Sequence, residues 1–325
     1  MKKKFFLLFF LQLCFNTTFV FSENESILPF VLPQPYQITS DPEPKGDFLK
    51  LVIPLKHIQN LLMVEATING VSGNFILDTG APYLVLNKTY FRDKMSKTDL
   101  VASGITGKGS EVGRTKIDKL QVQELYYENV EADISNLAQI ENSKGVKVLG
   151  LLGTNLFTQF EISIDVRRDV MQLYKLSKSG ERLFKEQSQV NPDLQLPFEL
   201  INNIIFIDGK IKEKALRFCF DSGAEVDVLS STANRKVLTE FKVLRRSVLV
   251  GSGGQRAEVL SGVLKQLQLG NHNFIALQTY LTNLNDLKTA YATYLDGVLG
   301  YPLLFNGVVA INFKQKKFSM YFYKN

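Results

Sequence analysis

The chain has 325 residues but no tryptophan, only two histidines and only two cysteines. His57 and His272 are isolated and cannot assemble the nitrogen and sulfur ligands of a zinc site, so we expect no metal and no cofactor. A catalytic cysteine would need a neighbouring base to generate its thiolate, and only these two histidines are at hand. The scarcity of both residue types disfavours metal-dependent and thiol-dependent chemistry.

Disulfides are missing as well from the mature protein that we expect. Cys14 lies in a leader sequence, where Leu13 before it disfavours lipidation, and Cys219 then remains alone. Without a disulfide, the fold has to be stabilised by burial of a core. Cys219 alternates with Phe218 and Phe220 just before an aspartate, which indicates a buried strand position with a packing role.

Long apolar runs are absent except near the start of the chain. Three lysines precede an apolar stretch at residues 5–15, and Val20 and Ser22 occupy the two small-residue positions before a cleavage site. The stretch is shorter than the roughly 20 residues that a membrane helix needs. We therefore predict a signal peptide at residues 1–22, export to a secreted or periplasmic location, and no stable membrane span after cleavage. A retained signal anchor is the alternative.

A strong excess of charge of one sign is also absent. The formal net charge is +6, and loss of the lysines at positions 2–4 with the leader leaves about +3. The basic clusters at 167–169 and 314–317 stand beside strand-like segments and are typical of solvated turns. We therefore expect no nucleic-acid partner.

The chain after the leader has a sequence pattern typical of a mostly β protein. Residues 23–47 hold five of the ten prolines, which is incompatible with a helix or a central strand, and we interpret them as an extended arm or a removable pro-segment. From Phe48 onward, alternating and β-branched patterns such as "KLVIPL", "NFILDTG" and "EISIDV" predict strands.

A repeat organises this β-rich part. "FILDTGAP" at 75–82 and "FCFDSGAE" at 218–225 lie 143 residues apart, and "GLLGTNLF" at 150–157 is matched by "GVLGYPLLF" at 297–305. The two copies also end alike, with "ISIDVRRDVMQLY" and "VAINFKQKKFSMY". A polar segment separates them. The pattern predicts a first lobe at 48–178, a linker at 179–194 and a second lobe at 195–325.

An Asp-Thr/Ser-Gly sequence on its own is an ordinary β-turn. Here each copy follows an apolar strand, and each is followed by a glycine-rich hairpin candidate and by an apolar-apolar-glycine segment in the same order. Asp78 and Asp221 are therefore candidate functional residues. The hairpin candidates are "GITGKGSEV" and "VGSGGQRAEV".

From about Phe48 to Tyr323 the chain resembles the aspartic peptidases, in particular a bilobal single chain built from two retropepsin-like lobes. The resemblance implies an all-β fold of two tandem acid-protease β-barrel lobes, related by an internal pseudo-two-fold axis with the active-site cleft between them. It assigns Asp78 and Asp221 as the catalytic pair. Supporting positions would be the loop residues Thr79, Gly80, Ala81, Ser222, Gly223 and Ala224, the braces Leu151, Leu152, Gly153, Val298, Leu299 and Gly300, and the substrate-binding flaps at Ile105, Gly107, Gly251 and Gly253.

The implied chemistry explains why one chain would carry the motif twice. Peptide hydrolysis by a carboxyl dyad needs one ionised aspartate to activate water and one neutral aspartate to polarise the scissile carbonyl. An internal two-fold axis brings two equivalent aspartates together without a homodimer, so we expect a monomeric endopeptidase with a peptide or protein substrate. A peptide-binding or inhibitory relative without turnover is the alternative, and a purely structural β-protein is a third possibility.

Three departures from the family pattern bear on this expectation. Alanine at 81 and 224 replaces the hydroxyl residue of pepsin-like enzymes, so nothing at these positions is expected to favour the charged forms. This predicts raised pKa values for the pair and maximal activity at about pH 4 to 6.5. Neither hairpin candidate has the tyrosine of pepsin-like flaps, which favours the retropepsin-like branch. Tyr301 and Pro302 follow the second brace, and because Pro302 lacks a backbone N–H, we expect the second loop to be braced differently.

Overall fold

The structure is a computed structural model that describes residues 40–104, 107–186, 190–250, 256–291 and 293–324. The predicted signal peptide and residues 23–39 of the predicted arm lie outside these ranges. Among the described residues, no helix has the length and apolar character needed to cross a membrane.

Most of the first half forms an eight-stranded sheet. Its strand order is β2-β3-β4-β9-β5-β8-β7-β6, so the short strand β9 is inserted between β4 and β5. β4 is exposed at its start and buried at Phe75, Ile76 and Leu77, so that an apolar run leads directly into the Asp78 loop. The strands are β2 (Lys56–Ile58), β3 (Leu61–Ile68), β4 (Val71–Leu77), β5 (Val85–Asn87), β6 (Ser96–Gly104), β7 (Gly107–Val122), β8 (Leu125–Ser135) and β9 (Gly150–Leu152).

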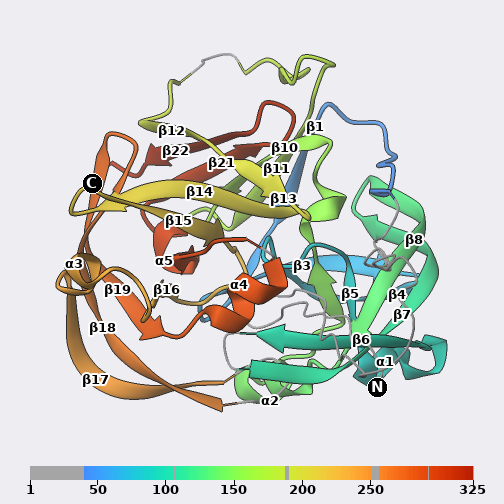
Figure 1. Cartoon of the computed structure of the whole chain (residues 1–325). Helices are drawn as coiled ribbons and strands as arrows, with labels where there is room; N and C mark the ends of the chain where they lie inside the picture. The colour runs from blue at the N-terminus through green and yellow to red at the C-terminus, as the bar shows by residue number, and fades with distance from the viewer. Residues whose placement is uncertain (1–39, 105–106, 187–189, 251–255, 292, 325) are drawn as a thin grey trace, which may run out of the picture.

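The second half forms another eight-stranded sheet with the same architecture. Its order, β13-β14-β15-β20-β16-β19-β18-β17, reproduces that of the first sheet strand by strand. The two sheets occupy opposite sides of the molecule (Figure 1). The strands are β13 (Glu199–Ile201), β14 (Ile204–Ile211), β15 (Lys214–Phe220), β16 (Asp227–Ser230), β17 (Phe241–Val250), β18 (Arg256–Leu269), β19 (His272–Thr282) and β20 (Gly297–Leu299).

A six-stranded sheet joins the halves. Its order is β1-β11-β10-β21-β22-β12, with three strands from each half, and it lies at the top of the view in Figure 1. At its centre β10 pairs antiparallel with β21, and Ser163 faces Ala310, its own equivalent in the repeat. The two halves are therefore paired symmetrically about Ser163 and Ala310. The strands are β1 (Lys50–Pro54), β10 (Phe160–Asp165), β11 (Val170–Lys175), β12 (Leu194–Pro197), β21 (Gly307–Asn312) and β22 (Lys317–Phe322).

The helices that the structure describes are short. Asn87 and Asn234 cap two of them, since their side chains accept hydrogen bonds from Thr89 N and Lys236 N. α4 of the second half lies against β6 of the first half. The helical segments are α1 (Lys88–Phe91), the 3₁₀ turn Arg92–Lys94, α2 (Ala138–Lys144), the 3₁₀ turn Thr154–Leu156, α3 (Arg235–Leu238), α4 (Asn285–Tyr291) and α5 (Tyr301–Leu304).

The strand before Asp221 shows how alternation creates the core. Phe218 and Phe220 belong to one apolar cluster, whereas Cys219 between them belongs to the other, and all three side chains are buried. Phe220 packs edge to face on Phe318 of β22, with 5.0 Å between ring centroids. The second eight-stranded sheet is thereby packed against the joining sheet, directly below the loop that carries Asp221.

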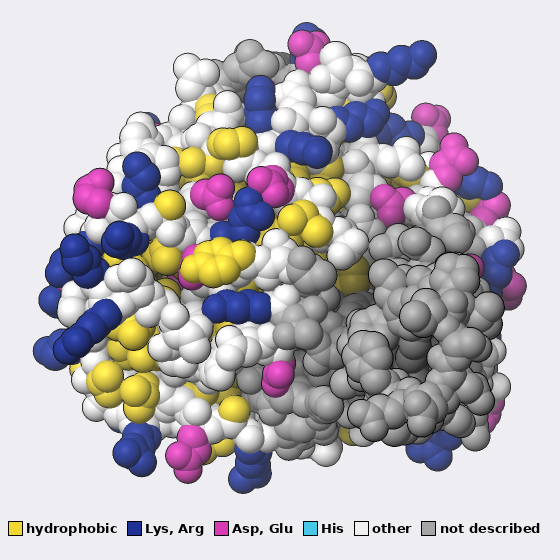
Figure 2. Space-filling view, in the orientation of Figure 1, with side chains coloured by type: hydrophobic (Ala, Val, Ile, Leu, Met, Phe, Trp, Pro, Cys, Tyr) yellow, Lys and Arg dark blue, Asp and Glu magenta, His cyan; other side chains and the backbone are white. Residues whose placement is uncertain are grey.

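The segment boundaries can be compared with the expected ones. β11 ends at Lys175 and β12 begins at Leu194, the last residue of the expected linker. The end of the predicted arm is tied to the fold, because Lys45 and Tyr126 exchange two backbone hydrogen bonds of 2.8 and 2.9 Å. Asp41 accepts further hydrogen bonds from Thr158 of the first half and Asn203 of the second. On the face shown in Figure 2, basic side chains are spread over the surface with acidic side chains among them.

Candidate active site

Two loops meet where the halves face each other, and each carries one aspartate. Asp78 follows β4 and Asp221 follows β15, and their side chains are 0% and 1% exposed. The backbone N–H of Asp78 donates to the carbonyl of Leu152 at 3.1 Å, and that of Asp221 donates to the carbonyl of Leu299 at 2.9 Å. The predicted brace segments, which form β9 and β20, therefore hold the start of each loop.

The two loops are also bonded to each other in a reciprocal manner. The backbone N–H of Thr79 donates to Ser222 Oγ at 3.1 Å, and the backbone N–H of Ser222 donates to Thr79 Oγ1 at 2.9 Å. Each hydroxyl in turn donates to a carbonyl of the opposite loop, Thr79 to Phe220 and Ser222 to Leu77. Four buried hydrogen bonds thus fix the loops in register.

The carboxyl groups lie within hydrogen-bonding reach of each other. Asp78 Oδ1 accepts from the backbone N–H groups of Gly80 and Ala81 at 2.9 and 3.0 Å, and Asp221 Oδ1 accepts from that of Gly223 at 2.9 Å. A Cβ atom on Gly80 would lie 2.4 Å from Asp221 Cγ, so only glycine permits this approach.

Burial raises the pKa of both carboxyl groups, and the proximity of Asp221 adds to the shift at Asp78. For Asp78, desolvation comes first and the charge of Asp221 second, and together they raise its pKa well above the ordinary value. Desolvation raises the pKa of Asp221 to about 6, while its hydrogen bonds with Asp78 and with backbone N–H groups oppose the shift. The pair therefore loses its protons in two steps, and between these steps one carboxyl group is ionised while the other is neutral.

One expectation about the alanines is wrong. The sequence suggested that nothing at positions 81 and 224 would favour the charged forms. The backbone N–H groups of Ala81 and Ala224 both lower the pKa of the neighbouring aspartate, because hydrogen bonds to a carboxylate do not require a side-chain hydroxyl. Desolvation still dominates, so the expected direction of the shift is retained.

The second loop is braced differently from the first, as Pro302 predicted. In the first half, Thr154 Oγ1 donates to Thr79 O, Thr154 N donates to Ala81 O, and Asn155 N donates to Pro82 O. In the second half, Tyr301 N donates to Ala224 O, which matches only one of these bonds.

Sequence reasoning missed buried carboxyl groups near each loop. Asp227 in β16 is 2% exposed, and its Oδ1 accepts from the backbone N–H of the brace residue Gly300 at 2.7 Å. Asp133 in β8 is fully buried and accepts from Arg114 Nε at 2.9 Å. Burial raises the pKa of each to about 7, with Arg114 opposing the shift at Asp133. The available signal was an aspartate within an apolar strand, as in "VDVLS".

The hairpin candidates are only partly described. β6 pairs with β7 up to Gly104 and Gly107, and β17 pairs with β18 up to Val250 and Arg256. Antiparallel arms therefore stand at both predicted positions, and β7 begins at Gly107. The flap residues Ile105, Gly251 and Gly253 lie outside the described residues. Neither the small apolar cavity beside Asp227 nor the larger cavity lined by Asp41 and Asn155 includes Asp78 or Asp221, so the cleft stays a prediction.

Comparison with known proteins bears on the first of these loops. Residues 64–156 match the sequence profile of the aspartyl protease family, a range that contains Asp78 and the first brace. This segment is therefore similar to the aspartyl protease family. The aspartyl protease match ends before β10 and does not include Asp221.

Among the solved structures, a retropepsin-like aspartic protease from Rickettsia conorii is similar to the chain, with 18% sequence identity and a TM-score of 0.28. The similarity covers 41% of this chain and 94% of that one. No curated protein matches the chain in sequence.

Proposed function

We propose that the chain is an aspartic endopeptidase whose catalytic pair is Asp78 and Asp221. The observation that carries this proposal is the reciprocal joining of two Asp-Thr/Ser-Gly loops, which places two buried carboxyl groups within hydrogen-bonding reach. Only the first of these loops falls in the matched aspartyl protease segment. The loop that carries Asp221 belongs to the second copy of the internal repeat.

The protonation states assign the roles. The ionised member of the pair would remove a proton from the attacking water, while the neutral member would donate a hydrogen bond to the scissile carbonyl. Water adds to the carbonyl carbon, the C–N bond then breaks, and the leaving nitrogen takes up the proton that the pair has gained. One shared proton thus serves both halves of the reaction.

The proposal includes the organisation of the chain. The equal strand orders of the two eight-stranded sheets support an internal duplication, and one chain that supplies both aspartates would function as a monomer. The leader at residues 1–22 supports export of the mature enzyme. Residues 23–47 would then form the N-terminal arm of the exported chain.

The test is incubation of the mature chain with a denatured protein mixture between pH 3 and 8, with products identified by mass spectrometry. Asp78→Asn and Asp221→Asn should each abolish cleavage and leave the circular dichroism spectrum unchanged, because each removes half of a unit. Near-normal turnover by either variant would contradict a shared pair. Retention of labelled peptides without any cleavage by the wild type would favour the peptide-binding relative instead.

A further inference from the structure

The second brace lacks bonds that the first one makes. Pro302 has no N–H to match that of Asn155, and Tyr301 has a ring where Thr154 has a hydroxyl that reaches Thr79 O. A catalytic pair nevertheless needs both carboxyl groups to be held in a productive position. The second loop therefore needs support from another source.

Asp227 supplies such support. Its Oδ1 accepts from Gly300 N at 2.7 Å, and the residue before Gly300 is Leu299, whose carbonyl accepts from Asp221 N. Asp227 is therefore connected to Asp221 by two hydrogen bonds, one at each of two adjacent residues of the second brace. The matching position of the first half is Leu84, which has no acceptor in its side chain.

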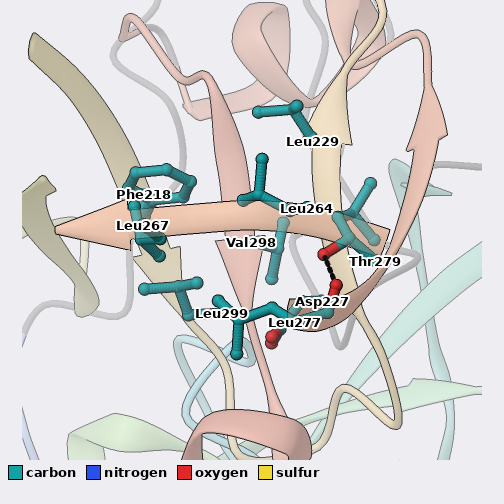
Figure 3. Close-up of a pocket in the computed structure, with 10 residues that line it drawn as sticks. Phe218, Asp227, Leu229, Leu264, Leu267, Leu277, Thr279, Val298 and Leu299 are labelled. Carbon is teal, nitrogen blue, oxygen red and sulfur yellow. Dashed lines mark hydrogen bonds between the residues drawn. The ribbon is translucent and has the colours of Figure 1, made fainter. Parts of the chain in front are cut away.

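Among the residues that the structure describes, the carboxyl group of Asp227 has no hydrogen-bond partner other than Gly300 N–H. Figure 3 shows it among apolar side chains, including Val298, Leu299 and Leu277. The hydroxyl of Thr279 donates to the carbonyl of Leu277 instead of to Asp227, and no side chain lining this cavity is charged apart from Asp227. Asp227 Oδ2 is buried and has no hydrogen-bond partner among the described residues. Burial of such a group costs free energy that a leucine would avoid, so packing alone does not explain it.

We propose that Asp227 is a positioning residue for Asp221, which anchors the second brace through Gly300 N–H in place of the contacts that Thr154 and Asn155 give the first brace. The inference rests on the proposed function for its effect on turnover, but its structural part does not depend on activity.

Three variants of the full mature chain test the role. Asp227→Leu introduces the residue of the first half and removes the acceptor. Asp227→Asn retains an acceptor oxygen in nearly the same volume. Thr279→Val changes the polarity of the same cavity without touching the brace, and serves as the matched control.

The first readout is amide hydrogen exchange at pH 5 in peptides that cover residues 219–225 and 297–301. Asp227→Leu should speed exchange at Gly300 and in the Asp221 loop at least about tenfold, whereas Asp227→Asn and Thr279→Val stay within about threefold of the wild type. Unchanged exchange in Asp227→Leu would overturn the proposal. If Asp227→Leu does not fold, Asp227→Asn decides, because loss of protection despite a retained acceptor would also overturn it.

The second readout is steady-state cleavage. Asp227→Leu should lower kcat at least about tenfold with KM within about twofold, and Asp227→Asn should restore kcat. Faster exchange with unchanged kcat would show that the bond exists but does not position Asp221, and would overturn the proposal. If the wild type cleaves nothing, the proposed function fails, and exchange in the Asp221 loop alone decides the positioning role.

Discussion

At the scale of single residues, the closeness of the two carboxyl groups depends on the absence of one methyl group. The Cβ atom that Gly80→Ala would add lies 2.4 Å from Asp221 Cγ, so one of the two loops has to move. A displacement of about 1 Å at a catalytic group can cost about 100-fold in rate. We expect Gly80→Ala to lower kcat by about that factor while the protein remains folded.

Gly145→Asn provides the matched control for this substitution. Gly145 has a left-handed φ of 64° that asparagine tolerates, and nothing lies within 4 Å of its Cβ position. Its kcat should equal that of the wild type within about twofold. A Gly80→Ala enzyme with wild-type kcat would show that the carboxyl groups do not meet at this glycine.

The pH dependence also belongs to this scale. Because activity needs one carboxyl group of the pair ionised and the other neutral, the acid limb of kcat should lie near pH 6, to which desolvation raises the pKa of Asp221, and the alkaline limb above it. The maximum should therefore fall at or above the upper end of the range of about pH 4 to 6.5 that the sequence suggested. An Ala81→Ser, Ala224→Ser double variant adds two hydroxyl donors and should move the profile towards acid. A wild-type maximum below about pH 3 would contradict the role of desolvation.

At the scale of elements, α2 links the halves beside the active site. Lys144 at its last turn donates to Glu225 Oε1 at 2.5 Å, and Glu225 belongs to the loop of Asp221. Lys144 is 10% exposed and Glu225 30% exposed, so water screens the ion pair incompletely. Asn60 adds a hydrogen bond from the first half to the carbonyl of Glu225.

We expect Lys144→Met to lower the free energy of unfolding by about 1–3 kcal/mol, because it leaves Glu225 without its cation while keeping the aliphatic volume. Urea denaturation at low and high salt measures this, and the difference from wild type should shrink at high salt. Lys175→Met, which removes a hydrogen bond to Gly46 within the first half, is the control for loss of a lysine. A salt-independent difference would contradict an electrostatic link.

The sequence predicts those features of these elements that depend on residues close together in the chain. The strands before Asp78 and Asp221, the order of loop, hairpin and brace, and the altered second brace follow from patterns that neighbouring residues carry. The cross-loop bonds of Thr79 and Ser222 and the bond of Asp227 to Gly300 do not, because each joins residues more than 70 positions apart. Tertiary packing determines which polar residues in an apolar strand find a partner.

At the scale of the whole molecule, buried carboxyl groups tie stability to pH. Burial raises the pKa of Asp227 from 3.8 to about 7, whereas in the unfolded chain it ionises near its ordinary value. Between about pH 4 and 7 the folded state therefore binds more protons than the unfolded state, and stability falls as the pH rises. Asp221 acts in the same direction up to about pH 6.

The free energy of unfolding should thus be highest near pH 4 and decline towards pH 7.5, with Asp227 contributing up to about 4 kcal/mol of the decline. Urea denaturation across this range measures the slope, and Asp227→Asn should reduce it. A wild type that becomes steadily more stable from pH 4.5 to 7.5 would show that Asp227 is not held neutral by burial.

The polypeptide can be divided into two halves at the six-stranded sheet, and we call the ladder between β10 and β21 the seam. Each half supplies three adjacent strands, and the halves share the ladder between β10 and β21. A first half expressed alone would expose the edge of β10, with the backbone groups that face β21 left unpaired. Because Ser163 pairs with its own equivalent Ala310, a second β10 strand has the right direction and register to take the place of β21. Two separate fragments would therefore recombine through this seam, and a lone first half would associate with a copy of itself.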